Sequence, residues 1–412
     1  MQPIIRIHGK DPQIDFGLKQ LFGKTPNAPL SICNLQTEEG RAALDASGVA
    51  ASVTDQGYQL AQLDTGEYVL AGGASGLMYG LIDLGHALNC GAPLPLGKHE
   101  PRFQYRGIKF NIPLDARTPS YSDASDSAWN NIPHMWEMDF WRDLIDALAR
   151  DKYNLISLWN LHPFPSMVRV PGYERVALED VKRTPEPVYG ASLMGYGMYG
   201  KKYAGSLVTV KKMSMDEKIQ FWRSVMLYGR ERGVYFTVMT WNVFIYGTEH
   251  TDYGIDDRLD NPVTRDYFRR SVAALINTYP LLMGVGVTAG ERMSVGRMPQ
   301  TDIAGDVKWL AQTYGQGVKD ALEDSDRPFM FIHRQHMSGV EEILKAFENL
   351  PCPICLSGKY SQAHMYSSVQ PHFSDSLFRS LRRRAKNETG NRKNEAEPTS
   401  TYAPGNIFRS GR

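Results

Sequence analysis

Residues 281–291 read LLMGVGVTAGE, an unbroken apolar run that ends on a carboxylate. Two earlier stretches have the same form, NLISLWN at residues 154–160 and VYFTVMTWNVF at residues 234–244. Continuous apolar residues, as opposed to alternating ones, are typical of strands buried on both faces of a parallel sheet. Helical patterns separate the three runs, so the sequence predicts a repeated strand–helix arrangement around a parallel sheet.

The same arrangement extends to both sides of these runs. A helix over residues 139–150 would place Phe140, Leu144 and Leu148 on one face. Further strands are expected at residues 106–112, 329–333 and 353–356.

Capping residues mark the starts of two more helices. Ser214 followed by Glu217 is a capping box, and Asn261 followed by Pro262 joins an N-cap to a proline in the first turn. A long stretch rich in Gly, Tyr and Met covers residues 165–213. Long loops in compact domains are usually functional, so we expect this excursion to border the site.

The polar residues at the strand ends select between two parallel folds. An open doubly wound sheet binds its ligand at one switch point, whereas a (β/α)8 barrel brings the carboxyl ends of all its strands to one mouth. Every strand predicted here ends on polar side chains, which favours a (β/α)8 TIM-type barrel. The clusters are Asn111, Asp115 and Arg117; Trp159, Asn160 and His162; Trp241 and Asn242; Glu291 and Arg292; His333, Arg334 and His336; and Lys359, Tyr360 and His364.

Only about six strand–helix units are visible, so the barrel is expected to be incomplete. Residues 376–412 hold nine Lys or Arg against three Asp or Glu, with few apolar residues, which predicts a disordered basic tail. We expect the reading frame to be cut short, with an unrelated tail replacing the last two units. The predicted organisation is an α/β domain at residues 1–97, the barrel domain at 98–373 and the tail at 374–412.

The N-terminal domain is predicted to be a small α/β unit with strands at residues 4–7, 30–35 and 68–71. Its last strand runs into GGASG at residues 72–76 and then into a helix with leucines at helical spacing. This glycine spacing matches neither the dinucleotide fingerprint nor the P-loop, so we expect a tight turn there. The Pro- and Gly-rich stretch at residues 91–97 marks the domain boundary.

Composition excludes several classes of protein. Lys plus Arg is 46 and Asp plus Glu is 45, so the net charge of +1 provides no general attraction to nucleic acid. Four cysteines in 412 residues exclude a disulfide scaffold, and no apolar run approaches the roughly 18 residues of a membrane helix. The N-terminus lacks the apolar core of a signal peptide. We therefore expect a soluble globular protein, cytoplasmic as it stands and periplasmic or secreted if the N-terminus is incomplete, with no membrane or nucleic-acid partner.

Glu291 is the foremost candidate for catalysis because it ends a buried apolar strand, where a carboxylate is costly without a function or a partner. A partly desolvated glutamate has a raised pKa and can serve as a general acid. An ion pair with Arg292 is the alternative. Glycoside hydrolysis usually needs a second carboxylate, and Asp115 lies nearest a strand end, although helix capping or pairing with an arginine would explain it equally well.

A sugar would suit the aromatic and amide side chains at the mouth. Trp159 and Trp241 are each followed by an asparagine, so an aromatic face could pack on a pyranose ring while amides bind its hydroxyls; core packing is the alternative. No metal or other cofactor is expected, because the histidines lack metal-site spacing and Cys352 and Cys355 have no second pair. Four cations lie at the predicted strand ends: Arg117, Arg292, Arg334 and Lys359. Unless some of them pair with Glu291 and Asp115, they suggest an anionic substrate, because arginine is suited to binding carboxylates.

Two motifs resemble a known family. HEPRFQYRG at residues 99–107, followed by LDAR at residues 114–117, resembles the opening of the catalytic barrel of β-N-acetylhexosaminidases, and RDKYNLISLWNLH at residues 150–162 is similar to its second strand. The first hundred residues are similar to the α/β domain that precedes this barrel and that of microbial α-glucuronidases. The resemblance implies that Arg117 holds the non-reducing sugar and that Glu291 is the general acid.

The sequence departs from hexosaminidases at Gly290, where that family places an aspartate that orients the acetamido group. Substrate-assisted cleavage is therefore not expected, and the cationic mouth favours the α-glucuronidase side of the resemblance. We expect an exo-acting glycoside hydrolase of acidic plant or algal saccharides, with Glu291 and Asp115 as catalytic residues. The expected substrate-binding residues are Arg117, Trp159, Asn160, His162, Trp241, Asn242, Arg334 and Lys359.

Two other functions stay open. A non-catalytic carbohydrate-binding protein would bind saccharides without turning them over. A nucleic-acid-binding protein would act through the basic tail, with an affinity that falls steeply with salt.

Overall fold

The computed structural model describes residues 4–120, 127–187, 205–289, 303–334 and 339–358, together with two short strands at 401–403 and 406–411. The chain divides into two compact units. Unit 1 is formed by Met1–Arg106, Arg142–Asn154 and Leu227–Val234. Unit 2 is formed by Gly107–Trp141, Leu155–Met226 and Tyr235–Arg412.

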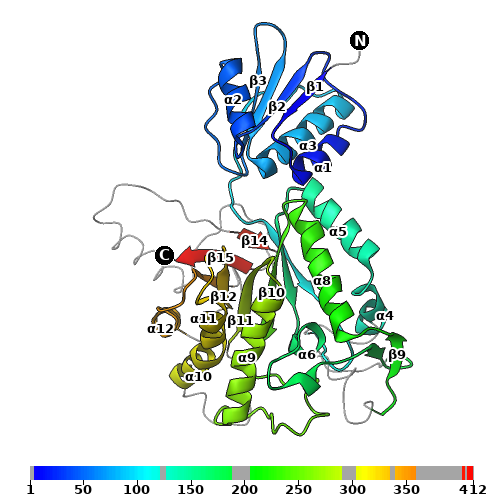
Figure 1. Cartoon of the computed structure of the whole chain (residues 1–412), viewed down its shortest axis with the longest axis vertical. Helices are drawn as coiled ribbons and strands as arrows, with labels where there is room; N and C mark the ends of the chain where they lie inside the picture. The colour runs from blue at the N-terminus through cyan, green and yellow to red at the C-terminus, as the bar shows by residue number, and fades with distance from the viewer. Residues whose placement is uncertain are drawn as a thin grey trace. The chain divides into compact units, whose positions relative to one another are not determined.

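Unit 1 contains a five-stranded sheet in the order β1-β2-β4-β3-β5 (Figure 1). The three strands predicted from the sequence are parallel to one another: β1 Ile5–His8, β2 Leu30–Asn34 and β4 Tyr68–Gly72. The strand β3 Tyr58–Gln62 and the edge strand β5 Gly97–His99 were not predicted, and β3 runs antiparallel to both of its neighbours.

Helices cover both faces of this sheet. The helices are α1 Pro12–Lys19, α2 Glu38–Ser47 and α3 Ala74–Cys90. On one side, Leu44 of α2 packs against Cys33, Val69 and Ala71 of the strands. Helices α1 and α3 pack against each other, and a Cβ at Gly17 would stand only 3.0 Å from the Leu81 side chain.

The glycine-rich turn at the start of α3 serves packing. A Cβ at Gly73 would lie 2.8 Å from the Asp55 carbonyl oxygen, and one at Gly76 would lie 1.8 Å from the Gly57 carbonyl oxygen. Only glycine permits the loop at residues 55–57 to approach this closely. The prediction of a tight turn is therefore confirmed.

Unit 2 is built on a curled sheet in the order β14-β15-β13-β12-β11-β10-β7-β6 (Figure 1). Six of its strands pair in parallel, which confirms the predicted mixed α/β class with a TIM-like parallel sheet. These strands are β6 Gly107–Asn111, β7 Leu155–Trp159, β10 Tyr235–Trp241, β11 Leu282–Thr288, β12 Met330–Arg334 and β13 Ile354–Gly358.

Two further strands lie within the stretch predicted to be a disordered tail. β15 Asn406–Gly411 pairs antiparallel with β13, and β14 Thr401–Ala403 pairs antiparallel with β15. Residues 359–400 lie outside the described part of the chain.

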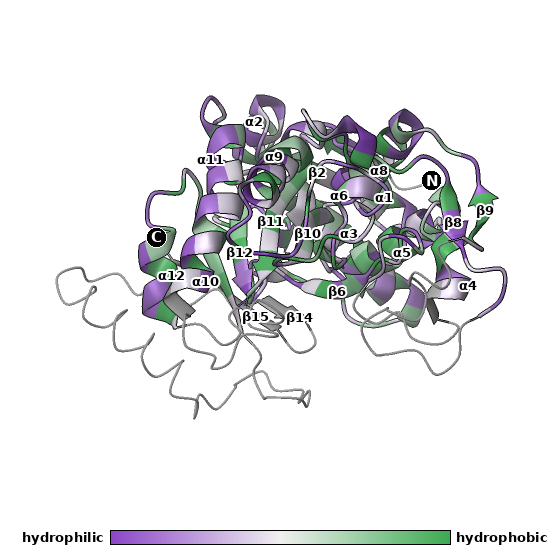
Figure 2. Cartoon of the chain, turned by 90° about the horizontal axis from the view of Figure 1, so that it is seen from below, coloured by the Kyte–Doolittle hydropathy of each residue, from purple (hydrophilic) through white to green (hydrophobic). Residues whose placement is uncertain are grey.

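Helices follow the parallel strands, and Figure 2 shows both hydrophilic and hydrophobic residues on α8 and α12, as expected for helices that cover a sheet. Between α10 and α11 the chain makes one π-helical turn, η2 Ala311–Gly315, without leaving the helical conformation. The helices are α4 Ser127–His134, α5 Met138–Arg150, α6 Phe164–Met167, α8 Met215–Arg230, α9 Pro262–Thr278, α10 Ile303–Leu310, α11 Gln316–Leu322 and α12 Val340–Ala346.

Both predicted helix caps are confirmed. At the start of α8 the backbone N–H of Ser214 donates to Glu217 Oε2 over 2.7 Å, and the N–H of Glu217 donates to Ser214 Oγ over 3.3 Å. At the start of α9 the side chain of Asn261 accepts from the N–H of Val263 over 2.9 Å. Each cap satisfies backbone donors that the first helical turn leaves open.

The buried face of α5 is displaced from the predicted one. It is centred on Trp141 and Ile145, both fully buried, whereas Phe140 and Leu144 lie at its margin. The indole of Trp141 packs edge-on against Trp222 of α8, with ring centres 5.1 Å apart. An aromatic partner on a neighbouring helix therefore decides which side of α5 turns inward.

The predicted long excursion contains structure of its own. It includes α6, the 3-10 turn η1 Glu174–Val176 and a two-stranded ribbon of β8 Val181–Arg183 and β9 Val208–Lys211. Residues 188–204 lie outside the described part of the chain.

Candidate functional site

The register of the sheet in unit 2 divides its side chains between two faces. Phe110 of β6 lies 5.7 Å from Trp141 of α5, and Phe331 of β12 stacks on Phe347 just after α12, so these positions face the helices. Alternate positions point to the opposite face, which we call the inner face. At the carboxyl ends of the six parallel strands, the inner face carries Asn111, Trp159, Trp241, Thr288, Arg334 and Ser357.

The two predicted tryptophans meet on this face. The rings of Trp159 and Trp241 lie 5.2 Å apart at 70°, an edge-to-face contact. The indole N–H of Trp159 donates to Ser157 Oγ over 2.8 Å, which holds the ring against its own strand. Both side chains are almost fully buried, which agrees with the core-packing alternative, and their contact with a sugar remains a prediction.

Two cations lie against the same tryptophan. Lys109 Nζ is 4.2 Å from the ring centre of Trp159 and 5.9 Å from that of Trp241. Arg334 Cζ is 5.9 Å from the ring centre of Trp159, and Arg334 is 5% exposed. Contacts within about 6 Å are stabilised by the ring quadrupole. Arg334 therefore lies against Trp159, and Lys109, which the sequence analysis did not single out, lies near both tryptophans.

Lys109 was missed in the sequence because it lies inside an apolar strand and two residues before its end. The segment GIKFN at residues 107–111 does contain a signal, since a lysine between apolar residues of a partly buried strand is costly without a partner.

Two hydroxyl groups complete the polar edge of the inner face. Thr288 Oγ1 and Ser357 Oγ are buried and have no hydrogen-bond partner in the part of the chain that the structure describes. A buried hydroxyl without a partner is costly, and a bound polar ligand is one way to satisfy it.

The two predicted asparagines are bonded to the backbone. Asn160 Nδ2 donates to the carbonyls of Ile112 and Thr118 over 2.8 and 2.9 Å, and its Oδ1 accepts from the N–H of His162. Asn242 Nδ2 donates to the Thr288 carbonyl over 3.1 Å. These amides hold the loops that leave β7 and β10. Either amide could bind a sugar hydroxyl only by giving up its hydrogen bonds to the backbone.

His162 is buried among aromatic rings. Its Nδ1 donates to the carbonyl of Tyr246 over 2.6 Å, and the hydroxyl of Tyr267 lies 3.1 Å from its Nε2. Burial lowers the pKa of His162 to about 4, so the ring is neutral near pH 7. Both nitrogens are occupied, which favours a structural role over direct contact with substrate.

Asp115 and Arg117 form the ion pair that the sequence left as an alternative to catalysis and sugar binding. Arg117 Nε and Nη2 donate to the two carboxylate oxygens of Asp115 over 2.7 and 2.8 Å, and the N–H of Lys182 also donates to Asp115. Arg117 further donates to the carbonyls of Glu179 and Asp180. Asp115 is fully buried, so the pair ties the loop after β6 to the excursion.

A buried lysine that the sequence analysis did not single out belongs to the same network. Lys218 Nζ donates to the carbonyls of Leu178 and Asp180 over 2.7 and 2.5 Å. Burial lowers the pKa of Lys218 to about 8. Lys218 stands in the polar stretch DEKIQ early in α8, so nothing in the local sequence pointed to burial or to these partners.

Several predicted residues lie outside the described part of the chain: Gly290, Glu291, Arg292, His336, Lys359, Tyr360 and His364. Their roles remain predictions. Among the residues that the structure does describe, no group of three His, Cys, Asp or Glu side chains could hold a metal ion. None of the described helices is both long and apolar enough to span a membrane.

The two cysteines with CxxC spacing are free thiols. Burial raises the pKa of Cys352 to about 11 and that of Cys355 to about 12. A thiol with a raised pKa is a poor nucleophile and metal ligand, which supports a packing role.

The curled parallel sheet with helices on one face defines a TIM-like fold. No protein-family model matches the chain, and no curated protein matches it. A structure described as a GH138 enzyme targeting pectin rhamnogalacturonan II superimposes with a TM-score of 0.64 at 17% identity, covering 89% of this chain and 39% of that one. A GH20 β-N-acetylhexosaminidase from Streptomyces coelicolor A3(2) gives a TM-score of 0.49 at 12% identity, covering 91% and 75%. The chain therefore spans well under half the length of the GH138 structure, and the likeness concerns the fold.

Proposed function

We propose that this chain is a glycoside hydrolase acting from the chain end on a saccharide that contains a uronic acid. The observation that carries the proposal is the position of Lys109 and Arg334 against Trp159 at the carboxyl ends of the parallel strands. In TIM-type folds this end of the sheet is where substrates bind.

Each part of this arrangement matches one feature of an acidic sugar. The apolar face of a pyranose ring packs on an aromatic side chain, and a carboxylate pairs with a lysine or arginine. Thr288 and Ser357 supply hydroxyl groups at the same edge. The proposal therefore assigns Trp159 and Trp241 to ring contact and Lys109 and Arg334 to the carboxylate, with Lys359 as a further cation.

Glu291 is proposed as the general acid that protonates the leaving-group oxygen as the glycosidic bond breaks. It follows β11, one of the two central strands among the six parallel ones, by three residues. Arg117 and Asp115 are proposed to organise the loop after β6, because their charged groups already satisfy each other. The six parallel strands would form the greater part of an incomplete barrel.

The fold supports a polysaccharide as the substrate. The GH138 structure that shares this fold is described as targeting pectin rhamnogalacturonan II. The cationic inner face then favours the acidic sugars of such a polymer over neutral ones.

Hydrolysis of aryl glycosides tests the proposal. The purified chain should release the aryl group from an α- or β-linked uronide (glucuronide or galacturonide) and not from the matched glucoside. Glu291→Gln should lower the rate about 10²–10⁴-fold, the usual contribution of a general acid, while binding the uronide as before. Full activity in Glu291→Gln, or faster hydrolysis of the glucoside, would refute it.

A non-catalytic carbohydrate-binding protein is the second candidate, and one observation favours it. Within the six described parallel strands, the inner face carries no Asp or Glu. Calorimetric binding of a uronide without release of the aryl group would support this alternative.

A further inference from the structure

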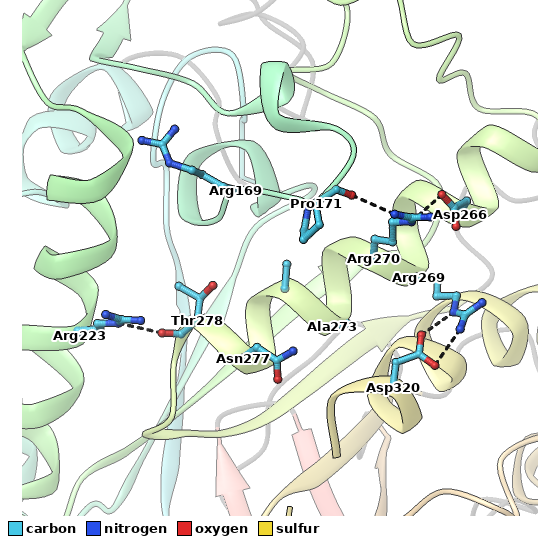
Figure 3. A pocket seen from close by; sticks show the side chains of 11 residues that line it. Arg169, Pro171, Arg223, Asp266, Arg269, Arg270, Ala273, Asn277, Thr278 and Asp320 are labelled. Atoms are coloured by element: carbon cyan, nitrogen blue, oxygen red, sulfur yellow. Dashed lines mark hydrogen bonds and ion pairs between the residues drawn. The ribbon is translucent and has the colours of Figure 1, made fainter. Parts of the chain in front are cut away.

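A second basic site lies away from the inner face, on the solvent side of α9. It is a groove of about 530 Å³ lined by residues of α8, α9, α11 and the segment after α6 (Figure 3). Four of the lining residues are arginines, Arg169, Arg223, Arg269 and Arg270. We call it the α9 groove.

The arginines stand at its two ends. Figure 3 shows Arg169 and Arg223 on one side and Arg269 and Arg270 on the other, with Ala273 between them. The side chain of Ala273 is a single methyl group and does not fill the space above α9. A flat molecule could therefore lie across α9 between the two pairs of guanidinium groups.

The pairing of these arginines leaves donors available. Arg269 is bound on two nitrogens by Asp320, at 2.5 and 3.0 Å, and Arg270 Nε lies 2.8 Å from Asp266. A guanidinium has five N–H donors in a planar fork, so each of these two keeps donors for a ligand.

Arg169 lies 3.6 Å from Glu179 and 3.3 Å from Asp216, two exposed carboxylates that do not line the groove. The Arg169 side chain is 41% exposed and stays accessible to a ligand.

Arg223 is the most available cation of the four. Its Nε donates to the Thr278 carbonyl at the end of α9 over 2.9 Å, and in the described part of the chain it has no carboxylate partner. The lining as a whole holds four arginines against Asp266 and Asp320, an excess of two positive charges.

The composition of the lining discriminates between anionic ligands. Arginine forks bind carboxylates, while Asp266, Asp320 and Asn277 can hydrogen-bond hydroxyl groups. The same aspartates would repel a chain with a phosphate at every unit, and the lining offers no aromatic ring on which a base could stack. A chain that carries both carboxylates and hydroxyls fits this mixture.

We propose that the α9 groove is a non-catalytic binding site for a run of uronic acid residues, which holds the acidic polysaccharide on the enzyme outside the inner face. This inference rests on the proposed function, since it takes the same class of polymer. The two sites would have separate roles: the inner face contacts the sugar at the chain end and the groove binds a more distant part of the chain.

Hexagalacturonate is the probe, and its binding to the full chain is measured by calorimetry. Arg223→Gln removes the cation that has no carboxylate partner in the described structure, and Ala273→Glu puts a carboxylate on the floor, within reach of Arg269 and Arg270 on the same face of α9. Each is expected to weaken binding at least about tenfold, the loss of one charge-assisted contact. Arg258→Gln removes another exposed arginine, paired with Asp256 outside the groove, and should leave binding unchanged.

Hydrolysis of a single-residue aryl uronide separates this inference from the proposed function. Unchanged hexagalacturonate binding in both groove variants would overturn the groove, whatever the hydrolysis assay gives. Weakened binding in the variants would support the groove even if the chain hydrolyses no aryl uronide. Binding of an inorganic polyphosphate at least as tight as that of hexagalacturonate, and equally sensitive to Arg223→Gln, would show a general anion site and overturn the proposal.

Discussion

Lys109 and Trp159 lie on neighbouring parallel strands, and the ammonium of Lys109 stands 4.2 Å from the centre of the Trp159 ring. In the sheet register Lys109 is opposite Ser157, one inner-face position before Trp159. Its long side chain therefore brings the charge forward onto the indole. A cation and an aromatic ring are thereby fixed together where the strands end.

Replacing Lys109 tests whether this charge recognises a carboxylate. Lys109→Met keeps most of the apolar side chain and removes the charge, so we expect binding of glucuronate to weaken about tenfold, the loss of one ionic contact, with binding of glucose unchanged. Calorimetry measures both. Lys345→Met, at an exposed position of α12, is the control. Equal losses for both sugars would mean that Lys109 acts only by packing.

Asp115→Asn should destabilise unit 2 strongly. It leaves Arg117, whose side chain is 16% exposed, without its carboxylate partner, and breaking a buried ion pair from one side costs about 3–5 kcal/mol. The free energy of unfolding in urea measures the change. Asp256→Asn breaks the exposed pair with Arg258 and should cost about 0–1 kcal/mol. Similar losses in both variants would argue against a structural role for Asp115.

Two buried histidines predict lower stability in acid. Burial lowers the pKa of His162 and of His333 to about 4, below the unfolded value of about 6.5. The unfolded chain therefore binds protons more readily than the folded one. The stability that depends on the two neutral histidines is fully present above about pH 6.5 and is lost as the pH falls from there toward 4. Each histidine contributes about 1.4 kcal/mol per pH unit in this window. Urea unfolding at pH 7.5, 6 and 5 measures the slope, and a flat profile would contradict the burial of both rings.

His333→Leu should raise stability at pH 7. Neither ring nitrogen of His333 has a hydrogen-bond partner in the described structure, and the ring packs edge-on against Phe347. Removing an unsatisfied buried polar group should stabilise the fold by about 1 kcal/mol. It should also halve the loss of unfolding free energy per pH unit in acid, because only His162 would then contribute. His162→Leu is the matched comparison and should destabilise, because both nitrogens of His162 are bonded. A loss of stability in His333→Leu would indicate a partner for its ring.

Gly286→Ala should destabilise the sheet. A Cβ there would stand 2.1 Å from Met239 Sδ and 2.6 Å from the Ile332 carbonyl oxygen, so strand β11 or its neighbours must shift. Such overpacking costs about 1–3 kcal/mol. Gly205→Ala, where nothing lies within 4 Å of the added Cβ, should leave the unfolding midpoint unchanged.

Much of the fold was predictable because its signals are local. The six parallel strands of unit 2 are apolar runs, and the caps at Ser214 and Asn261 satisfy backbone groups within a few residues. β3 was missed because its buried and more exposed positions alternate as YQLAQ, which marks an antiparallel strand near a sheet edge and not a buried parallel one.

The candidate site was predictable only in part. The sequence placed Trp159, Trp241 and Arg334 at strand ends, and strand direction alone brings such residues to one edge of a parallel sheet. It did not find Lys109, whose position inside a strand hides its partner on the next one.

What the sequence determined by itself is therefore the order of strands and helices and the edge at which their polar residues gather. The tertiary structure decided how those residues are used. Asp115 is matched by Arg117 and by the backbone of Lys182, 67 positions away, while His162 is enclosed by Tyr246 and Tyr267. Whether a polar side chain faces a ligand or holds a loop depends on the partners that folding brings to it, and these come from distant parts of the chain.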